Sequence, residues 1–167
     1  MGRFMIRILE GSIFIKDIEM FLGKIKENRK SKNNVILALD ADKLAGEKHL
    51  MFAIEKAMNS SKTGRNIAKD PGKEIMLYAA GTRQINRAVK IGLHNGKNNI
   101  ALVAIGEDID LSAFDEIAPG NVLRYDVSKN PVLMDFFNIT HEEVKAVGED
   151  KIPELVLERV ALVDVMK

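Results

Sequence analysis

Uninterrupted apolar runs mark three predicted strands along the chain. They cover residues 35–39, 75–80 and 100–105, and each run is continuously apolar instead of alternating with polar residues. Strands have this composition where helices cover both faces of a sheet. We therefore predict three buried strands. Residues 3–9, in which apolar side chains alternate, predict a more exposed strand, and residues 122–125 predict a weaker one.

The segments between these runs have the apolar spacing of helices. Apolar residues recur every three or four positions in residues 17–28 and 47–60, which predicts two amphipathic helices. A third helix is predicted over residues 82–93, so that residues 75–105 form a βαβ unit. Residues 140–143, Thr-His-Glu-Glu, have the pattern of a capping box ahead of a short helix.

The last segment, residues 152–166, is apolar on nearly every side of a helical wheel. A helix of this kind is buried all round. Two alternatives follow: the segment belongs to the protein's own structure, as a helix inserted into the core or with its valine-rich end as an edge strand, or part of it is covered by a second protein. For the second alternative, the predicted partner-binding residues are Leu155, Val156, Arg159, Leu162 and Val163.

These elements predict an α/β fold, a single domain over residues 1–167 with a mixed central sheet flanked by helices on both faces. The chain has no cysteine, which excludes disulfides, thiolate metal sites and a cysteine nucleophile. No run approaches the roughly 18 apolar residues of a membrane span, and the first residues lack the pattern of a signal peptide. We expect a cytoplasmic protein that has no contact with a membrane.

Charge is distributed unevenly, although the net charge is only +1. Residues 56–100 carry nine basic side chains against two acidic ones, whereas residues 101–167 carry six basic against fourteen acidic. A basic segment attracts polyanions and an acidic one repels them. The middle of the chain is therefore the predicted nucleic-acid-binding region.

The residues predicted to bind nucleic acid lie in a polar segment before the run at 75–80 and in the turn after it. Loops of such length are often functional or disordered. Lysine and arginine neutralise phosphates, amide side chains read base edges, and an apolar side chain supports an unstacked base. The predicted residues are Lys62, Arg65, Asn66, Ile67, Lys69, Arg83, Gln84 and Arg87, and Lys90 shares the outward face. The alternative is a solvated basic surface that binds no ligand.

Candidate catalytic chemistry is sparse. The three histidines lack the spacing of metal ligands, and no hydrolase or phosphate-loop motif is present. Thr82 reads as a helix N-cap, where backbone amides bind anions in many α/β proteins. Asp40 and Asp42 are more typical of a helix cap than of a cation site, and His49 is more typical of a hydrogen-bonded core histidine. We expect no enzyme activity, no metal and no cofactor.

Several short motifs together carry a family resemblance that extends from about residue 4 to 166. The most specific is Tyr78-x-x-Gly81-x-x-Gln84-Ile85, with Asn66-Ile-Ala upstream. The others are Gly46-x-x-His49, the stretch Arg83-Gln-Ile-x-x-Ala88 and the terminal Val156-Leu-Glu-Arg-Val-Ala-Leu162. In these motifs the chain resembles the CGI-type, TPRKB-like subunit of the KEOPS complex, and the pattern favours an archaeal member.

The resemblance implies a non-catalytic subunit of mixed α/β fold. Such a subunit binds the PRPK/Bud-type kinase of KEOPS and captures the single-stranded 3′ CCA end of tRNA, supporting threonylcarbamoyladenosine modification. The motif positions carried over are His49, Asn66, Tyr78, Gly81, Gln84 and Ile85. The kinase-binding surface is expected on the C-terminal helix, or second on residues 17–28, and the protein is expected to be monomeric outside the complex.

Two other functions stay open. The first is a protein-protein interaction module that regulates a kinase, with no direct role in nucleic-acid binding. The second is a small α/β enzyme or anion-binding protein that uses the turn at Thr82 and Asp40.

Overall fold

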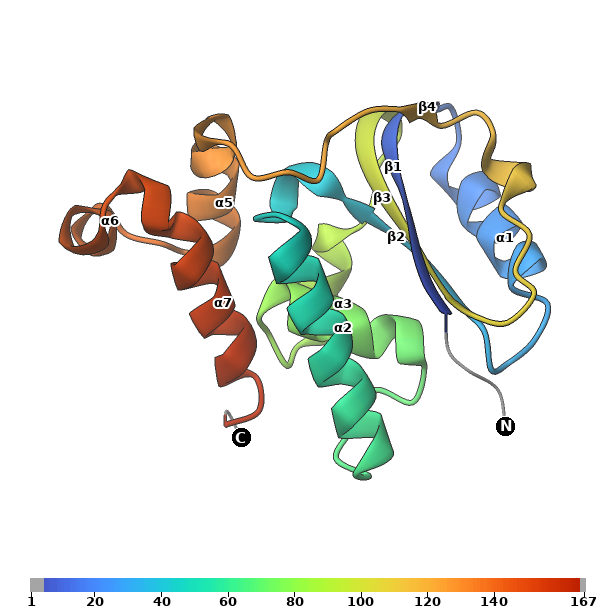
Figure 1. Cartoon of the computed structure of the whole chain (residues 1–167), viewed down its shortest axis with the longest axis horizontal. Helices are drawn as coiled ribbons and strands as arrows, with labels where there is room; N and C mark the ends of the chain where they lie inside the picture. Colours follow the sequence, from blue (N-terminus) through green and yellow to red (C-terminus); the bar gives the residue numbers. More distant parts are fainter. Residues whose placement is uncertain (1–4, 166–167) are drawn as a thin grey trace. The chain divides into compact units, whose positions relative to one another are not determined.

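The computed structural model describes residues 5–165 (Figure 1). Arg3 and Phe4 of the first predicted strand and Met166 of the last predicted helix lie outside the described residues. The α/β class is confirmed, because the described chain contains a four-stranded sheet and seven α-helices. The strands are β1 (Met5–Ile15), β2 (Val35–Asp40), β3 (Gly96–Gly106) and β4 (Ala118–Pro119). The helices are α1 (Ile18–Arg29), α2 (Glu47–Lys62), α3 (Pro71–Ala80), α4 (Ile85–Ala88), α5 (Asn130–Phe137), α6 (His141–Val147) and α7 (Ile152–Leu162).

The chain divides into two compact units. The first consists of the residues up to Ala41 together with Gly92–Val122, and the second consists of Asp42–Ile91 together with the residues from Leu123 onward. The whole sheet belongs to the first unit. The predicted nucleic-acid-binding residues and the predicted partner-binding residues of the C-terminal helix belong to the second, whereas residues 17–28, the second choice for the kinase-binding surface, belong to the first.

The first unit is an antiparallel sheet with the strand order β2-β3-β1-β4. Its long central pair, β1 and β3, aligns Met5 with Gly106 and Ile15 with Gly96. Helix α1 begins after Asp17, whose side chain accepts a hydrogen bond from the Glu19 amide. Phe21 and Ile25 of α1 pack in a core cluster with side chains from one face of the sheet. The predicted strands at 35–39 and 100–105 and the helix at 17–28 are therefore confirmed.

The second unit is helical, and the amphipathic helix predicted over residues 47–60 is its longest element, α2. Helices α3 and α7 both contact α2, and α5 contacts α7. The capping box is confirmed at α6, where the Thr140 side chain accepts from the Glu143 amide and the Glu143 side chain accepts from the Thr140 amide. Gly148 ends that helix.

The predicted strand over residues 75–80 is wrong, because these residues lie in helix α3. The Asp70 side chain caps the helix at the Lys73 amide, and Pro71 occupies its first turn. Five of the six residues from Ile75 to Ala80 are buried, so α3 has no polar side that would reveal its helical period. The βαβ unit over 75–105 is therefore wrong as well, and the sheet is antiparallel at each pairing instead of mixed.

Two smaller predictions also need correction. The helix predicted over residues 82–93 is only the short α4, followed by a 3-10 turn at Val89–Ile91. Its N-cap is Gln84 instead of Thr82, whose side-chain oxygen accepts a hydrogen bond from the Gln84 amide. Residues 122–125 form no strand.

Candidate functional site

The basic segment between α2 and α3 is held by a buried acid, Glu74. Its carboxylate accepts hydrogen bonds from the Ile67 amide at 3.0 Å, the Ala68 amide at 2.7 Å and the Ser60 hydroxyl at 2.7 Å. Charge-assisted hydrogen bonds of this kind are stronger than neutral ones. Glu74 thus fixes the backbone of the loop from inside, while its basic side chains face outward.

The loop residues predicted to bind nucleic acid have accessible side chains. Lys62, Arg65, Asn66 and Lys69 are exposed, and Ile67 is half-buried. The Asn66 amide nitrogen donates to the Ala68 carbonyl at 2.9 Å, which fixes the orientation of its side chain. The Asn66 carbonyl oxygen is left to accept a hydrogen bond from a ligand.

The turn after α3 meets the C-terminal end of α7. Gly81 ends α3 in the left-handed conformation at φ 65°, and a Cβ atom there would lie 3.1 Å from the Arg159 Cβ. Arg83 follows, and its guanidinium donates to the Val163 carbonyl at 3.0 Å. Arg83 therefore caps the end of α7, where the free carbonyl groups carry partial negative charge.

A second group of polar side chains surrounds Asp164 at the same end of α7. The Lys56 ammonium lies 2.7 Å from one carboxylate oxygen, and the Tyr78 hydroxyl donates to the other at 2.5 Å. Burial would raise the pKa of Asp164, but these two hydrogen bonds hold it below its ordinary value. Burial and the bond to Asp164 raise the pKa of Tyr78 to about 12. The positive charge of Arg65 in the loop also favours the ionised form of this carboxylate and so lowers the pKa of Asp164.

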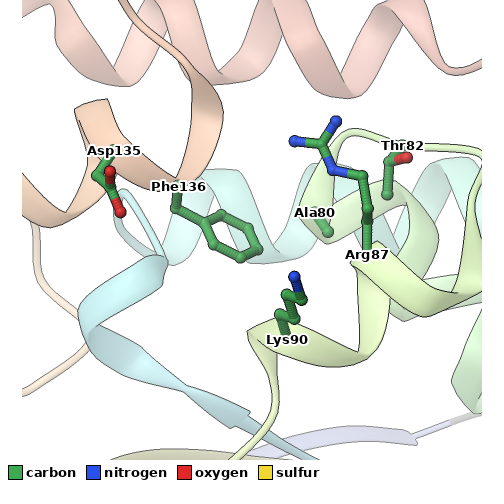
Figure 2. A pocket seen from close by; sticks show the side chains of 6 residues that line it. All are labelled: Ala80, Thr82, Arg87, Lys90, Asp135 and Phe136. Atoms are coloured by element: carbon green, nitrogen blue, oxygen red, sulfur yellow. The ribbon is translucent and has the colours of Figure 1, made fainter.

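A pocket in the second unit contains Arg87, the last of the predicted nucleic-acid-binding residues. It has a volume of about 210 Å³. Figure 2 shows Arg87, Lys90 and Thr82 along one side and Asp135 and Phe136 of α5 opposite them. The Lys43 ammonium lies 5.1 Å from the Phe136 ring centroid and donates to the Lys90 carbonyl at 2.7 Å. The pocket thus combines several cations with one aromatic ring and one carboxylate.

Sequence reasoning missed Glu74, Asp135 and Phe136 as contributors to these surfaces. A signal existed for Glu74, since it is one of only two acidic residues in a segment that is otherwise basic. No comparable signal existed for the two α5 residues, because they belong to the acidic part of the chain. Only the packing of α5 in the same unit as α4 reveals them.

His49 is a buried structural residue, as its position on α2 predicts. Its Nδ1 accepts from the Ala45 amide at 2.9 Å, so the ring proton sits on Nε2, which lies 2.8 Å from the Ala79 carbonyl oxygen. Burial lowers the pKa of His49 to about 4, outweighing the opposing effect of the Ala79 bond. The neutral ring ties the start of α2 to the end of α3.

Most of the predicted partner-binding residues are engaged inside the chain. Leu155, Val156 and Val163 are buried, so the core-insertion alternative describes them. Arg159 donates to the Phe137 and Asn138 carbonyls and pairs with the Glu143 carboxylate at 3.0 Å. Leu162 differs, since 49% of its surface is exposed.

Residues 5–165 contain neither a cluster of metal-ligating side chains nor a helix that could cross a membrane. No group of three or more His, Asp or Glu side chains in that range is arranged to hold a metal ion. Asp40 ends β2, and Asp42 lies in the 3-10 turn Ala41–Lys43. No helix in the range is both long and apolar enough to span a membrane.

The sequence of the chain matches a known protein family. Residues 16–164 match the family described as kinase binding protein CGI-121. The chain is also similar to the regulatory protein Cgi121 of the archaeon Methanocaldococcus jannaschii, with 32% identity over 133 residues. That match covers 77% of this chain and 83% of the relative.

Proposed function

Because the chain belongs to the CGI-121 family of kinase-binding proteins, we propose that it is a non-catalytic subunit of a KEOPS complex. In this role it binds a PRPK/Bud-type kinase and captures the 3′ CCA end of tRNA. By delivering tRNA to the complex, it supports formation of threonylcarbamoyladenosine. Catalysis belongs to the other subunits.

One observation supports tRNA binding most strongly: a set of exposed cations lies in a single compact unit, and Glu74 holds the backbone of the loop that carries part of the set. The set consists of Lys62, Arg65, Lys69, Arg83, Arg87 and Lys90. Cations of this kind bind phosphates by releasing counterions, with little regard for base sequence. Ile67 and Phe136 add apolar surface of the type on which unpaired bases rest.

Removing single cations from the loop tests this assignment. Lys62→Ala and Lys69→Ala change exposed side chains, so the fold should tolerate both. We expect each variant to weaken tRNA binding and to reduce the slope of log affinity against log salt by about 1. Lys145→Ala on α6, also exposed, is the matched control and should bind as the unchanged protein does. An unchanged salt slope in both loop variants would contradict the loop assignment.

The exposed end of α7 is the proposed kinase-binding surface. Leu162 is 49% exposed and Val165 is 67% exposed, whereas the rest of the helix is largely occupied by contacts within the chain. Leu162→Glu should abolish co-purification with the kinase while circular dichroism stays unchanged. Val147→Glu changes an apolar residue on α6 of similar exposure, 43%, and should leave co-purification intact. Retention of the kinase by Leu162→Glu would place the interface elsewhere.

The alternative function is a kinase-binding module that does not bind tRNA. It is favoured by the engagement of two basic residues within the chain, Arg83 at Val163 and Arg159 at Glu143. Under this alternative the purified chain retains the kinase but gives no salt-dependent binding of tRNA. Titration of tRNA at several salt concentrations therefore separates the two functions.

A further inference from the structure

The C-terminal end of α7 places one carboxylate, Asp164, among donor groups of α2 and α3. The Lys56 ammonium of α2 lies 2.7 Å from one carboxylate oxygen, and the Tyr78 hydroxyl of α3 donates to the other at 2.5 Å. Arg83 donates to the carbonyl of Val163, the residue before Asp164, at 3.0 Å. Two donors from different helices therefore converge on the space of a single anionic group.

The same donors suit a phosphate. A phosphodiester has two anionic oxygens that accept charge-assisted hydrogen bonds, as the two oxygens of Asp164 do. Burial and the bond to Asp164 raise the pKa of Tyr78 to about 12, so its hydroxyl keeps its proton at neutral pH and can donate. The Lys56 ammonium also lies 5.6 Å from the Phe52 ring centroid, a contact that does not involve Asp164. Lys56 and Tyr78 thus form a donor pair for one anion, and Asp164 fills it.

The contact that fills this position is accessible to solvent. The Asp164 side chain is 24% exposed and the Lys56 side chain 29% exposed. Ion pairs near the surface contribute little to stability, because water and salt screen them. Helix α7 ends at Leu162, and the Asp164 and Val165 amides beyond it bond to carbonyls three residues back, at 3.4 and 3.0 Å. Rotation of the Asp164 side chain therefore releases the two donors without unfolding α7.

We propose that Asp164 is an autoinhibitory contact, whose carboxylate occupies a phosphate-binding position formed by Lys56 and Tyr78 and competes there with the RNA backbone. The inference rests on the proposed binding of tRNA and adds a regulation of the basic surface. Arg65 of the loop contributes a positive charge that acts on the same carboxylate. Release of Asp164 exposes the charge of Lys56 and removes a negative charge that offsets Arg65.

The test titrates one intact tRNA against the unchanged chain and a small set of variants. Asp164→Asn keeps the shape of the side chain and removes its charge, and Asp164→Ser is a second variant at that position. Glu158→Gln removes the same charge from an exposed residue of α7 and is the matched control. Lys56→Ala is made in the unchanged chain and in Asp164→Asn, which measures the coupling between the two residues. Circular dichroism checks the fold of each variant.

Both Asp164 variants should bind tRNA about three- to fivefold more tightly than the unchanged chain, the size of one exposed ion pair. Their slope of log affinity against log salt should be steeper by about 1, because Lys56 then releases a counterion of its own. Lys56→Ala should weaken binding more in Asp164→Asn than in the unchanged chain. Glu158→Gln should bind as the unchanged chain does.

An equal gain in Asp164→Asn and Glu158→Gln would assign the effect to overall charge and overturn the inference. Unchanged or weaker binding by both Asp164 variants would also overturn it, and either result leaves the proposed function standing. Failure of every chain to bind tRNA would overturn both.

Free phosphate has the same chemistry as the RNA backbone, so inorganic phosphate at constant ionic strength is the second probe. If the position serves RNA, the tighter binding of tRNA by Asp164→Asn shrinks as inorganic phosphate is added. Tighter binding of inorganic phosphate by Asp164→Asn, with no gain for tRNA, would contradict the assignment to RNA.

Discussion

At the scale of single residues, the motif positions divide into those that are engaged inside the second unit and those that stay exposed. His49, Tyr78 and Gly81 are engaged inside the second unit, through hydrogen bonds or close contact. Asn66 and Gln84 keep exposed side chains. The most specific part of the family resemblance, around Tyr78 and Gly81, therefore reports mainly on how α3 meets α7.

His49 predicts a pH dependence of stability. Its pKa falls from 6.5 to about 4 on folding, so the neutral ring contributes stability above pH 6.5 that is lost as the pH falls toward 4. At pH 4.5 the chain should be about 2 kcal/mol less stable than at pH 7 from this residue alone. Urea unfolding at both pH values, compared with His49→Gln, measures the difference. An equal loss in the variant would show that His49 is not its source.

At the scale of elements, α7 is held by contacts along most of its length. Arg159 joins it to the end of α5 and to the capping box of α6, and Arg83 binds the carbonyl of Val163. The Lys56 and Tyr78 side chains bind Asp164 just beyond the helix. The Arg83 contact orders the turn after α3, which carries part of the proposed tRNA-binding surface.

The close approach of α3 and α7 at Gly81 gives a prediction with an internal control. Gly81 and Gly64 both have positive φ, 65° and 72°, but only Gly81 lies against another helix. Gly64→Ala should cost about 1 kcal/mol from backbone strain alone. Gly81→Ala should cost about 2 kcal/mol or more, because its Cβ would also meet Arg159. Urea unfolding of both variants tests this, and equal losses would contradict the steric part.

Glu74 predicts a change in the order of the basic loop. Replacing it with Gln removes the charge that accepts hydrogen bonds from three donors, Ser60, Ile67 and Ala68, and should loosen residues 63–69. Limited trypsin digestion should then cleave after Arg65 or Lys69 several times faster than in the unchanged chain. Glu55→Gln on α2 is exposed and should have no effect. Unaltered cleavage in Glu74→Gln would show that other contacts hold the loop.

How far the sequence predicts these elements depends on whether each has a polar side. Helices α1 and α2 were predictable because polar residues mark the outer side of each. Helix α3 was not, because a short helix buried on nearly every side has the same apolar run as a buried strand. The cap and proline at Asp70-Pro71 are the local signal for its start.

The candidate site was predictable in its loop but not in its pocket. Local charge marks Lys62, Arg65 and Lys69 as a polyanion-binding surface. Phe136 and Asp135 are separated from Arg87 by many residues and come together with it only through tertiary packing. Similarly, apolar composition alone does not distinguish the exposed Leu162 from the buried Val163.

At the scale of the whole molecule, the second unit contains both the basic middle of the chain and the acidic segment after Leu123. One basic side chain of the middle segment forms an ion pair with the acidic segment, since Lys56 pairs with Asp164. The exposed positive charge therefore includes Lys62, Lys69 and Arg87, whose side chains have no hydrogen bond or ion pair within residues 5–165. A positive surface limited to a few residues suits a short single-stranded RNA end better than a long RNA duplex.

The central claim, capture of the tRNA 3′ end, is tested most directly by one titration. The purified chain is titrated with intact tRNA and with the same tRNA trimmed of its CCA nucleotides, at one moderate salt concentration. Each stacked base contributes about 1–3 kcal/mol, so trimming should lower the affinity about tenfold or more. Equal affinity for the intact and the trimmed tRNA would contradict the claim.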